Sequence, residues 1–166
     1  SWCAHCVAAR AVDRPHVATP APSEHAIPRS AVDYCYMSET DPATLKGRHV
    51  HKEGECPILV VKDTANKFHW SSTLQSKGTN DFNVKLLSEF VRETGYIELQ
   101  LGSDNEHAIV ALKDEVIKSL NKENIRITPI EAQTGDHRSN GDVESAVKEI
   151  KRQCRAILST LEAKMR

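Results

Sequence analysis

The order in which hydrophobic spacing changes along the chain constrains its fold more than any other feature. Three strand-like segments come first, and no helical spacing separates them. Helical and strand-like spacing then alternate to the end of the chain. The eight predicted elements follow the order β-β-β-α-β-α-β-α, at residues 31–37, 57–63, 67–75, 80–95, 96–102, 106–121, 125–130 and 142–166. Antiparallel strands followed by strand–helix alternation predict an α/β fold, with a mixed five-stranded sheet flanked by helices.

The 166 residues suffice for one domain and a tail. Residues 1–30 hold four of the seven prolines and no sustained periodicity, so we expect an extended leader before a domain at 31–166. No signal peptide and no membrane-spanning apolar run is present, so we expect no membrane partner. Five cysteines, an odd number, fit a reducing, intracellular compartment. Because the chain starts at Ser1 rather than Met, we expect a piece of a longer protein.

Three acidic residues stand at positions that favour a metal site. Asp33 lies inside an apolar strand, where an uncompensated carboxylate costs several kcal/mol. Asp104 follows the strand at 96–102, and Glu144 lies in the first turn of the last helix. Carboxylate oxygens are the ligands that Mg²⁺ and Mn²⁺ prefer, and pairs of such ions serve phosphoryl transfer. If the three acids converge, they would form a two-metal site.

Each acid also has an ordinary structural explanation. Asp104 can be a helix N-cap, because Ser103-x-x-Glu106 matches a capping box. Glu144 in a first turn interacts favourably with the helix dipole. Asp33 can pair with a buried Arg or Lys. For each residue taken singly, these alternatives stay open.

Three sequence strings, taken in order, resemble the catalytic motifs of retroviral and LTR-retrotransposon integrase cores. They are VDYCYM, LGSDNEHAIVAL and SNGDVESAVKEIKR, and the resemblance covers roughly residues 31–160. It implies a ribonuclease-H-like fold and an integrase-type polynucleotidyl transferase cut from a Pol-type polyprotein. The catalytic and metal-binding residues would be Asp33, Asp104 and Glu144, holding two Mg²⁺ or Mn²⁺. The implied reaction is DNA integration, with 3′-end processing followed by strand transfer.

The same resemblance implies partners and further contacts. Asn140 falls where the family's active-site loop touches donor DNA, and Lys148 and Lys151 follow Glu144 on one helix face, where basic groups suit phosphates. The alternative is a solvated face with a weak Glu144–Lys148 pair. Element ends and target DNA would be the partners of a homo-oligomer acting in the nucleus. The 39 residues of segment 105–143 exceed the family's usual spacing, which indicates a divergent copy.

Two sets of His and Cys residues are candidate zinc ligands. Cys3 and Cys6 have the spacing of two ligands of one Zn²⁺. The resemblance implies that they end a zinc-binding module whose histidines lie upstream, in the full-length parent. His49, His51 and Cys56 form a weaker candidate, because alternating histidines in a charged loop are more often solvated.

Two other functions fit the same predicted fold. One is a ribonuclease-H-like nuclease that cuts without joining, and the other is a catalytically inactive nucleic-acid-binding remnant. A gel that separates joined from cut DNA distinguishes the first from an integrase. The remnant predicts salt-sensitive DNA binding without metal-dependent turnover.

Overall fold

The computed structural model describes residues 26–37, 55–131 and 141–165, and these form eight elements in the predicted order. The strands and helices follow the order that the hydrophobic spacing predicts, and each boundary lies within about two residues of its expected position. Their bounds are β1 Arg29–Cys35, β2 Ile58–Asp63, β3 His69–Thr73, α2 Asp81–Thr94, β4 Glu98–Ser103, α3 His107–Asn121, β5 Arg126–Glu131 and α4 Gly141–Met165.

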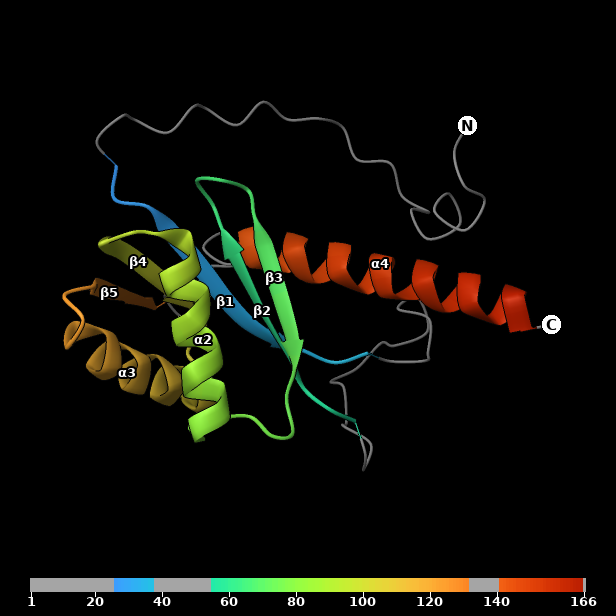
Figure 1. Ribbon diagram of the computed structural model, residues 1–166, viewed down its shortest axis with the longest axis horizontal. Helices are drawn as coiled ribbons and strands as arrows, with labels where there is room; N and C mark the ends of the chain where they lie inside the picture. Colours follow the sequence, from blue (N-terminus) through green and yellow to red (C-terminus); the bar gives the residue numbers. More distant parts are fainter. Residues whose placement is uncertain (1–25, 38–54, 132–140, 166) are drawn as a thin grey trace.

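The five strands form one mixed sheet in the order β3-β2-β1-β4-β5. β1 pairs antiparallel with β2, and β2 with β3, whereas the β1–β4 and β4–β5 pairs are parallel. Helices α2 and α3 cover one face of the sheet and α4 crosses the other (Figure 1). The predicted mixed five-stranded sheet flanked by helices is therefore confirmed.

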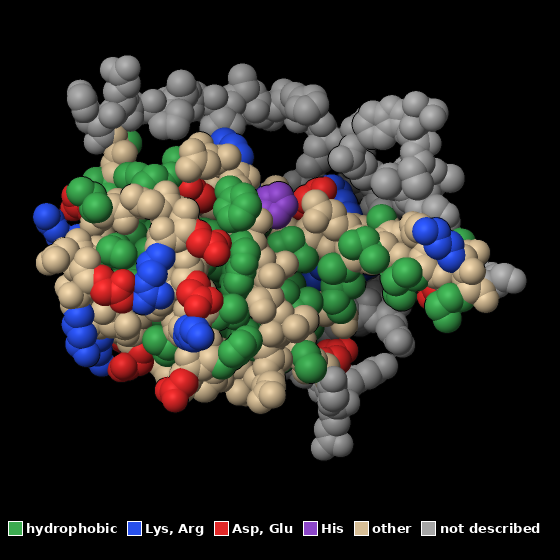
Figure 2. Space-filling view, viewed as in Figure 1, with side chains coloured by type: hydrophobic (Ala, Val, Ile, Leu, Met, Phe, Trp, Pro, Cys, Tyr) green, Lys and Arg blue, Asp and Glu red, His purple; other side chains and the backbone are tan. Residues whose placement is uncertain are grey.

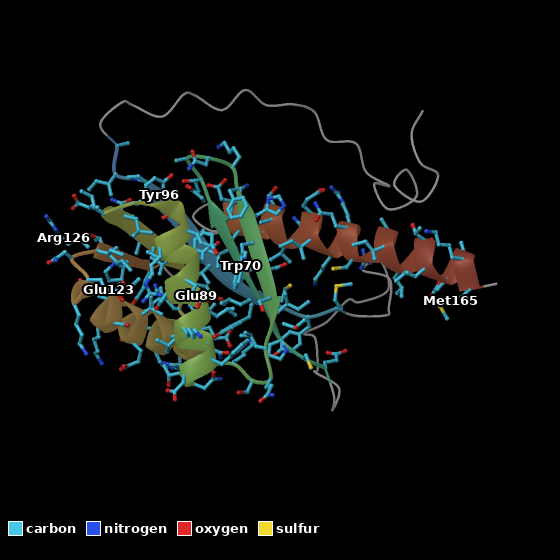
Figure 3. All side chains as sticks on the ribbon, in the orientation of Figure 1. Trp70, Glu89, Tyr96, Glu123, Arg126 and Met165 are labelled. Carbon is cyan, nitrogen blue, oxygen red and sulfur yellow. The ribbon has the colours of Figure 1, made fainter. Side chains whose placement is uncertain are left out.

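Coverage on both faces explains the continuous apolar run in β2. Leu59 and Val61 belong to the core shared with α2 and α3, whereas Val60 belongs to the core under α4. All three are fully buried. Trp70 of β3 packs beside α2, with its ring centroid 6.1 Å from that of Phe90 (Figure 3). A Trp within a predicted strand is expected to pack on the sheet or in the core, and Trp70 does so.

Local caps fix both ends of α2. The Asn80 side chain accepts a hydrogen bond from the Asn83 backbone N–H at 2.8 Å, which satisfies one free donor of the first turn. Gly95 ends the helix with φ of 72°, a left-handed conformation that glycine adopts without steric cost, and its N–H donates to the Arg92 carbonyl. Asn before a helical pattern and Gly after it are residue types that favour these two positions, so the sequence alone predicts both ends of α2.

The start of α3 differs from the expected capping box. The N-cap is Glu106, and its side chain makes no capping hydrogen bond. Asp104 lies two residues earlier, where its Oδ1 accepts from the Glu106 backbone N–H at 3.2 Å. The explanation of Asp104 as an N-cap is therefore wrong, and its carboxylate lies in the turn between β4 and α3.

The apolar stripe of α4 is buried only along its first half. Val143, Ala146 and Ile150 pack on the sheet, while the rest of the helix projects beyond it (Figure 1). Hydrophobic side chains are visible along this projecting part (Figure 2). Met165 lies at its far end (Figure 3). The exposed apolar row of α4 consists of Ile157, Leu158, Leu161 and Met165, with 52–85% of each residue accessible.

Candidate functional site

Asp33 and Asp104 come together because β1 and β4 are neighbouring parallel strands. Their register pairs Ala31 with Gly102, so two further residues bring Asp33 opposite Asp104 at the carboxyl ends. Ala31 and Cys35 belong to the core under α4. Because side chains alternate along a strand, Asp33 lies on this same face of the sheet. In open α/β sheets, ligands bind at such carboxyl ends.

The Asp33 carboxyl group is electrostatically unusual. Burial raises its pKa most, the neighbouring Asp104 carboxylate raises it further, and Glu106 adds to the effect. The Tyr34 backbone N–H, which donates to Asp33 Oδ1 at 2.7 Å, and the Lys77 ammonium both lower it. The resulting pKa is about 6, against an ordinary value of 3.8. The Asp33 carboxyl group is thus buried beside a second carboxylate, and the Lys77 charge offsets only part of the effect on its pKa.

Lys77 is a charged neighbour of Asp33, although no sequence pattern singles this lysine out. Its ammonium pairs with Glu106 Oε1 at 2.7 Å and lies 5.0 and 5.3 Å from the ring centroids of Tyr34 and Tyr36. These contacts tie the β3–α2 connection to the start of α3, beside the acids. Because Lys77 is bonded to Glu106, it does not act as the direct ion-pair partner that one alternative assigned to Asp33.

Glu144 lies on an exposed part of the first turn of α4. Within the described residues, no group of three or more His, Cys, Asp or Glu side chains is arranged to hold a metal ion. The structure therefore brings Asp33 and Asp104 together without grouping Glu144 with them. A Glu144–Lys148 pair is also absent from the ion pairs formed within the described ranges.

The two predicted DNA-binding lysines lie in different surroundings. The Lys151 charge lies close enough to the Cys35 thiol to affect its pKa. Burial raises this pKa to about 11, and the Lys151 charge partly opposes the rise. Lys151 is therefore near β1, whereas Lys148 lines a groove against β2 and β3. Asn140 lies outside the described residues.

The zinc predictions concern residues of which most are not described. Cys3, Cys6, His49 and His51 lie outside the described ranges. Cys56 is described, and it is an exposed free cysteine. In the described part of the chain, no helix has both the length and the hydropathy that crossing a bilayer requires.

The Asp33–Asp104 pair fits a hard divalent cation. Both groups offer carboxylate oxygens, and a bound cation would offset the burial and the neighbouring Asp104 charge that raise the pKa of Asp33. The bond from the Tyr34 N–H fixes one oxygen of Asp33. The chemistry of this donor set therefore suits Mg²⁺ or Mn²⁺ better than a soft metal.

Comparison with known proteins gives structural matches alone. No protein-family model and no curated protein matches the chain. The catalytic core domain of BIV integrase matches 80% of this chain and 72% of its own, with 17% identity and a TM-score of 0.52. The HTLV-2 integrase catalytic core in complex with magnesium matches 62% of this chain and 61% of its own, with 14% identity and a TM-score of 0.37. A simian T-cell lymphotropic virus intasome matches 76% of this chain and 42% of its own, with 13% identity and a TM-score of 0.40.

The match to the BIV core shows the fold of this chain. The mixed sheet flanked by helices is ribonuclease-H-like, as in an integrase catalytic core, and the predicted fold class is confirmed. At 17% identity the likeness concerns the fold alone.

Proposed function

We propose that this chain is an integrase-type polynucleotidyl transferase core that processes the ends of retroelement DNA and joins them to target DNA. The observation that carries the proposal is the meeting of Asp33 and Asp104 at the carboxyl ends of β1 and β4. Glu144 lies in the first turn of α4, the helix that packs on the same face of the sheet. The integrase-like fold and the order of the three acids in the sequence support the same function.

Asp33, Asp104 and Glu144 would hold two Mg²⁺ or Mn²⁺ ions, which supply positive charge to the attacked phosphate and lower the pKa of the nucleophile. The chain itself positions the acids. The Tyr34 N–H orients Asp33, while the Lys77–Glu106 pair fixes the β4–α3 turn that carries Asp104. Lys148, Lys151 and Asn140 would bind DNA, the first two through phosphates.

The experiment that tests this function is a joining assay with the purified chain. A labelled duplex with a recessed 3′ end is incubated with plasmid DNA and Mg²⁺, and the products are separated on a denaturing gel. An integrase gives labelled products longer than the substrate. Shorter products alone would assign the chain to the nuclease alternative. Binding without any product would assign it to the inactive alternative.

Self-association is a further part of the proposal, with a second copy of the chain as the partner. The exposed apolar row of α4 continues the buried stripe of the same helix past the sheet. A two-fold interface can pair one such row with the same row of a second copy. Action on chromosomal DNA would place the assembly in the nucleus. Zn²⁺ at Cys3 and Cys6 in a longer parent stays a prediction.

We expect Leu161→Glu to weaken this self-association, because it places a charge within the exposed apolar row of α4. Sedimentation velocity would show a shift from dimer toward monomer, on the order of tenfold in the dissociation constant. Ala163→Glu adds the same charge outside the row and is the matched control. An equal response of both variants, or a wild-type chain that is monomeric throughout, would contradict the prediction.

A further inference from the structure

A groove lies where the β2–β3 hairpin meets α4, on the other side of α4 from β4. Its volume of about 230 Å³ is below the range of roughly 300–1,000 Å³ typical of sites for whole small molecules. The space suits a single charged group, such as a phosphate, better than an entire ligand. We call it the basic groove; its lining includes Lys62, Lys67, His69, Lys148 and Arg152.

Positive charge in the basic groove exceeds what the local acids neutralise. Lys62 pairs with Asp142 at 3.6 Å, and Arg152 pairs with Glu149 at 3.8 Å. Both distances are long for charge-assisted hydrogen bonds, so an incoming anion can compete for these cations. Lys67 and Lys148 form no ion pair within the described residues.

The hairpin that carries Lys67 is firmly held. Asp63 accepts hydrogen bonds from the Ala65 backbone N–H at 2.9 Å, from the Asn66 amide at 3.1 Å and from the Tyr96 hydroxyl at 2.8 Å. The bonds to Ala65 and Asn66 lie within the turn that precedes Lys67, and Tyr96 ties the turn to the start of β4. The rim of the groove is therefore preformed.

We propose that the basic groove binds the phosphate backbone of DNA, beside the carboxylate site rather than within it. The inference rests on the proposed function, in which DNA is the substrate. Lys148 and Arg152 are separated by about 6 Å along the helix, so they can contact different phosphates. Because the hairpin supplies Lys67 and His69 from across the groove, a strand would be held between two elements.

The test compares two double variants that each remove two permanent charges. Lys67→Ala/Arg152→Ala changes the basic groove. Lys85→Ala/Lys118→Ala changes α2 and α3, on the opposite face of the sheet. Circular dichroism and thermal melting establish that both variants fold. Binding of a fluorescein-labelled 20-base-pair duplex is then measured by anisotropy in EDTA, between 50 and 200 mM NaCl, so no metal-dependent step contributes.

We expect the groove variant to bind the duplex roughly 5- to 20-fold more weakly near 100 mM NaCl. The slope of log affinity against log salt concentration should become less steep by about 1.8, because two fewer phosphates are neutralised. The control should change by less than about twofold. Equal weakening in both variants, or wild-type affinity in the groove variant, would overturn the inference. A wild-type chain without DNA binding would overturn the proposed function as well.

Discussion

Asp33→Asn should raise the free energy of unfolding of the metal-free protein at pH 7 by on the order of 1–3 kcal/mol. The folded-state pKa of Asp33 is about 6 and its ordinary value is 3.8, so the fold disfavours the ionised carboxylate. The native state bears nearly all of this cost at pH 7 and above, where the carboxyl group is almost fully ionised. The Asn side chain keeps an oxygen that accepts from the Tyr34 N–H, while it removes the buried charge.

Urea titrations at several pH values measure this effect. The stability difference between Asp33→Asn and wild type should shrink as the pH falls from 6 to 4, because the native wild-type protein then takes up the proton. Asp114→Asn, on an exposed position of α3, is the matched control and should change stability little at any pH. A destabilised Asp33→Asn protein at pH 7 would show that the carboxylate is compensated in the fold.

Asp33→Asn and Asp104→Asn should each reduce Mg²⁺-dependent strand transfer by on the order of 10³-fold or more, because the ions' charge stabilisation is worth several kcal/mol. Glu144→Gln should have a comparable effect if Glu144 completes the site. The joining gel gives the rates, with Asp114→Asn as the control. Circular dichroism should show that the fold is retained in each variant.

This experiment also decides whether Glu144 is the third acid of the site. It is exposed and not grouped with the two aspartates, whereas Glu106 is close enough to raise the pKa of Asp33. Full activity of Glu144→Gln together with loss in Glu106→Gln would transfer the third role to Glu106. Full activity of Asp33→Asn would contradict the whole assignment.

The fold was predictable because hydrophobic spacing reports which faces of each element are buried. The continuous run at residues 58–61 required cover on both faces, and the sheet has α2 and α3 on one side and α4 on the other. Asn80 and Gly95 marked the ends of α2 through local hydrogen bonding alone. Hydrophobic spacing and helix caps depend on residues close together in the sequence, so the elements could be predicted without knowing how they pack.

Other features depend on where separate elements meet, and the sequence does not encode that directly. The stripe of α4 continues to Leu161, but periodicity cannot show that the sheet ends near Cys154. The Lys77–Glu106 pair joins residues 29 positions apart. For Asp104, a local capping motif competed with a tertiary role, and the structure places it in a turn instead.

Calorimetric titration of the purified chain with Mn²⁺ at pH 7.5 tests most directly whether the carboxylates on β1 and β4 share a cation. We predict saturable binding to the wild-type chain and to Asp114→Asn, with the binding heat abolished in Asp33→Asn and in Asp104→Asn. Undiminished binding in both of these variants, or an absence of binding to the wild-type chain, would contradict the account.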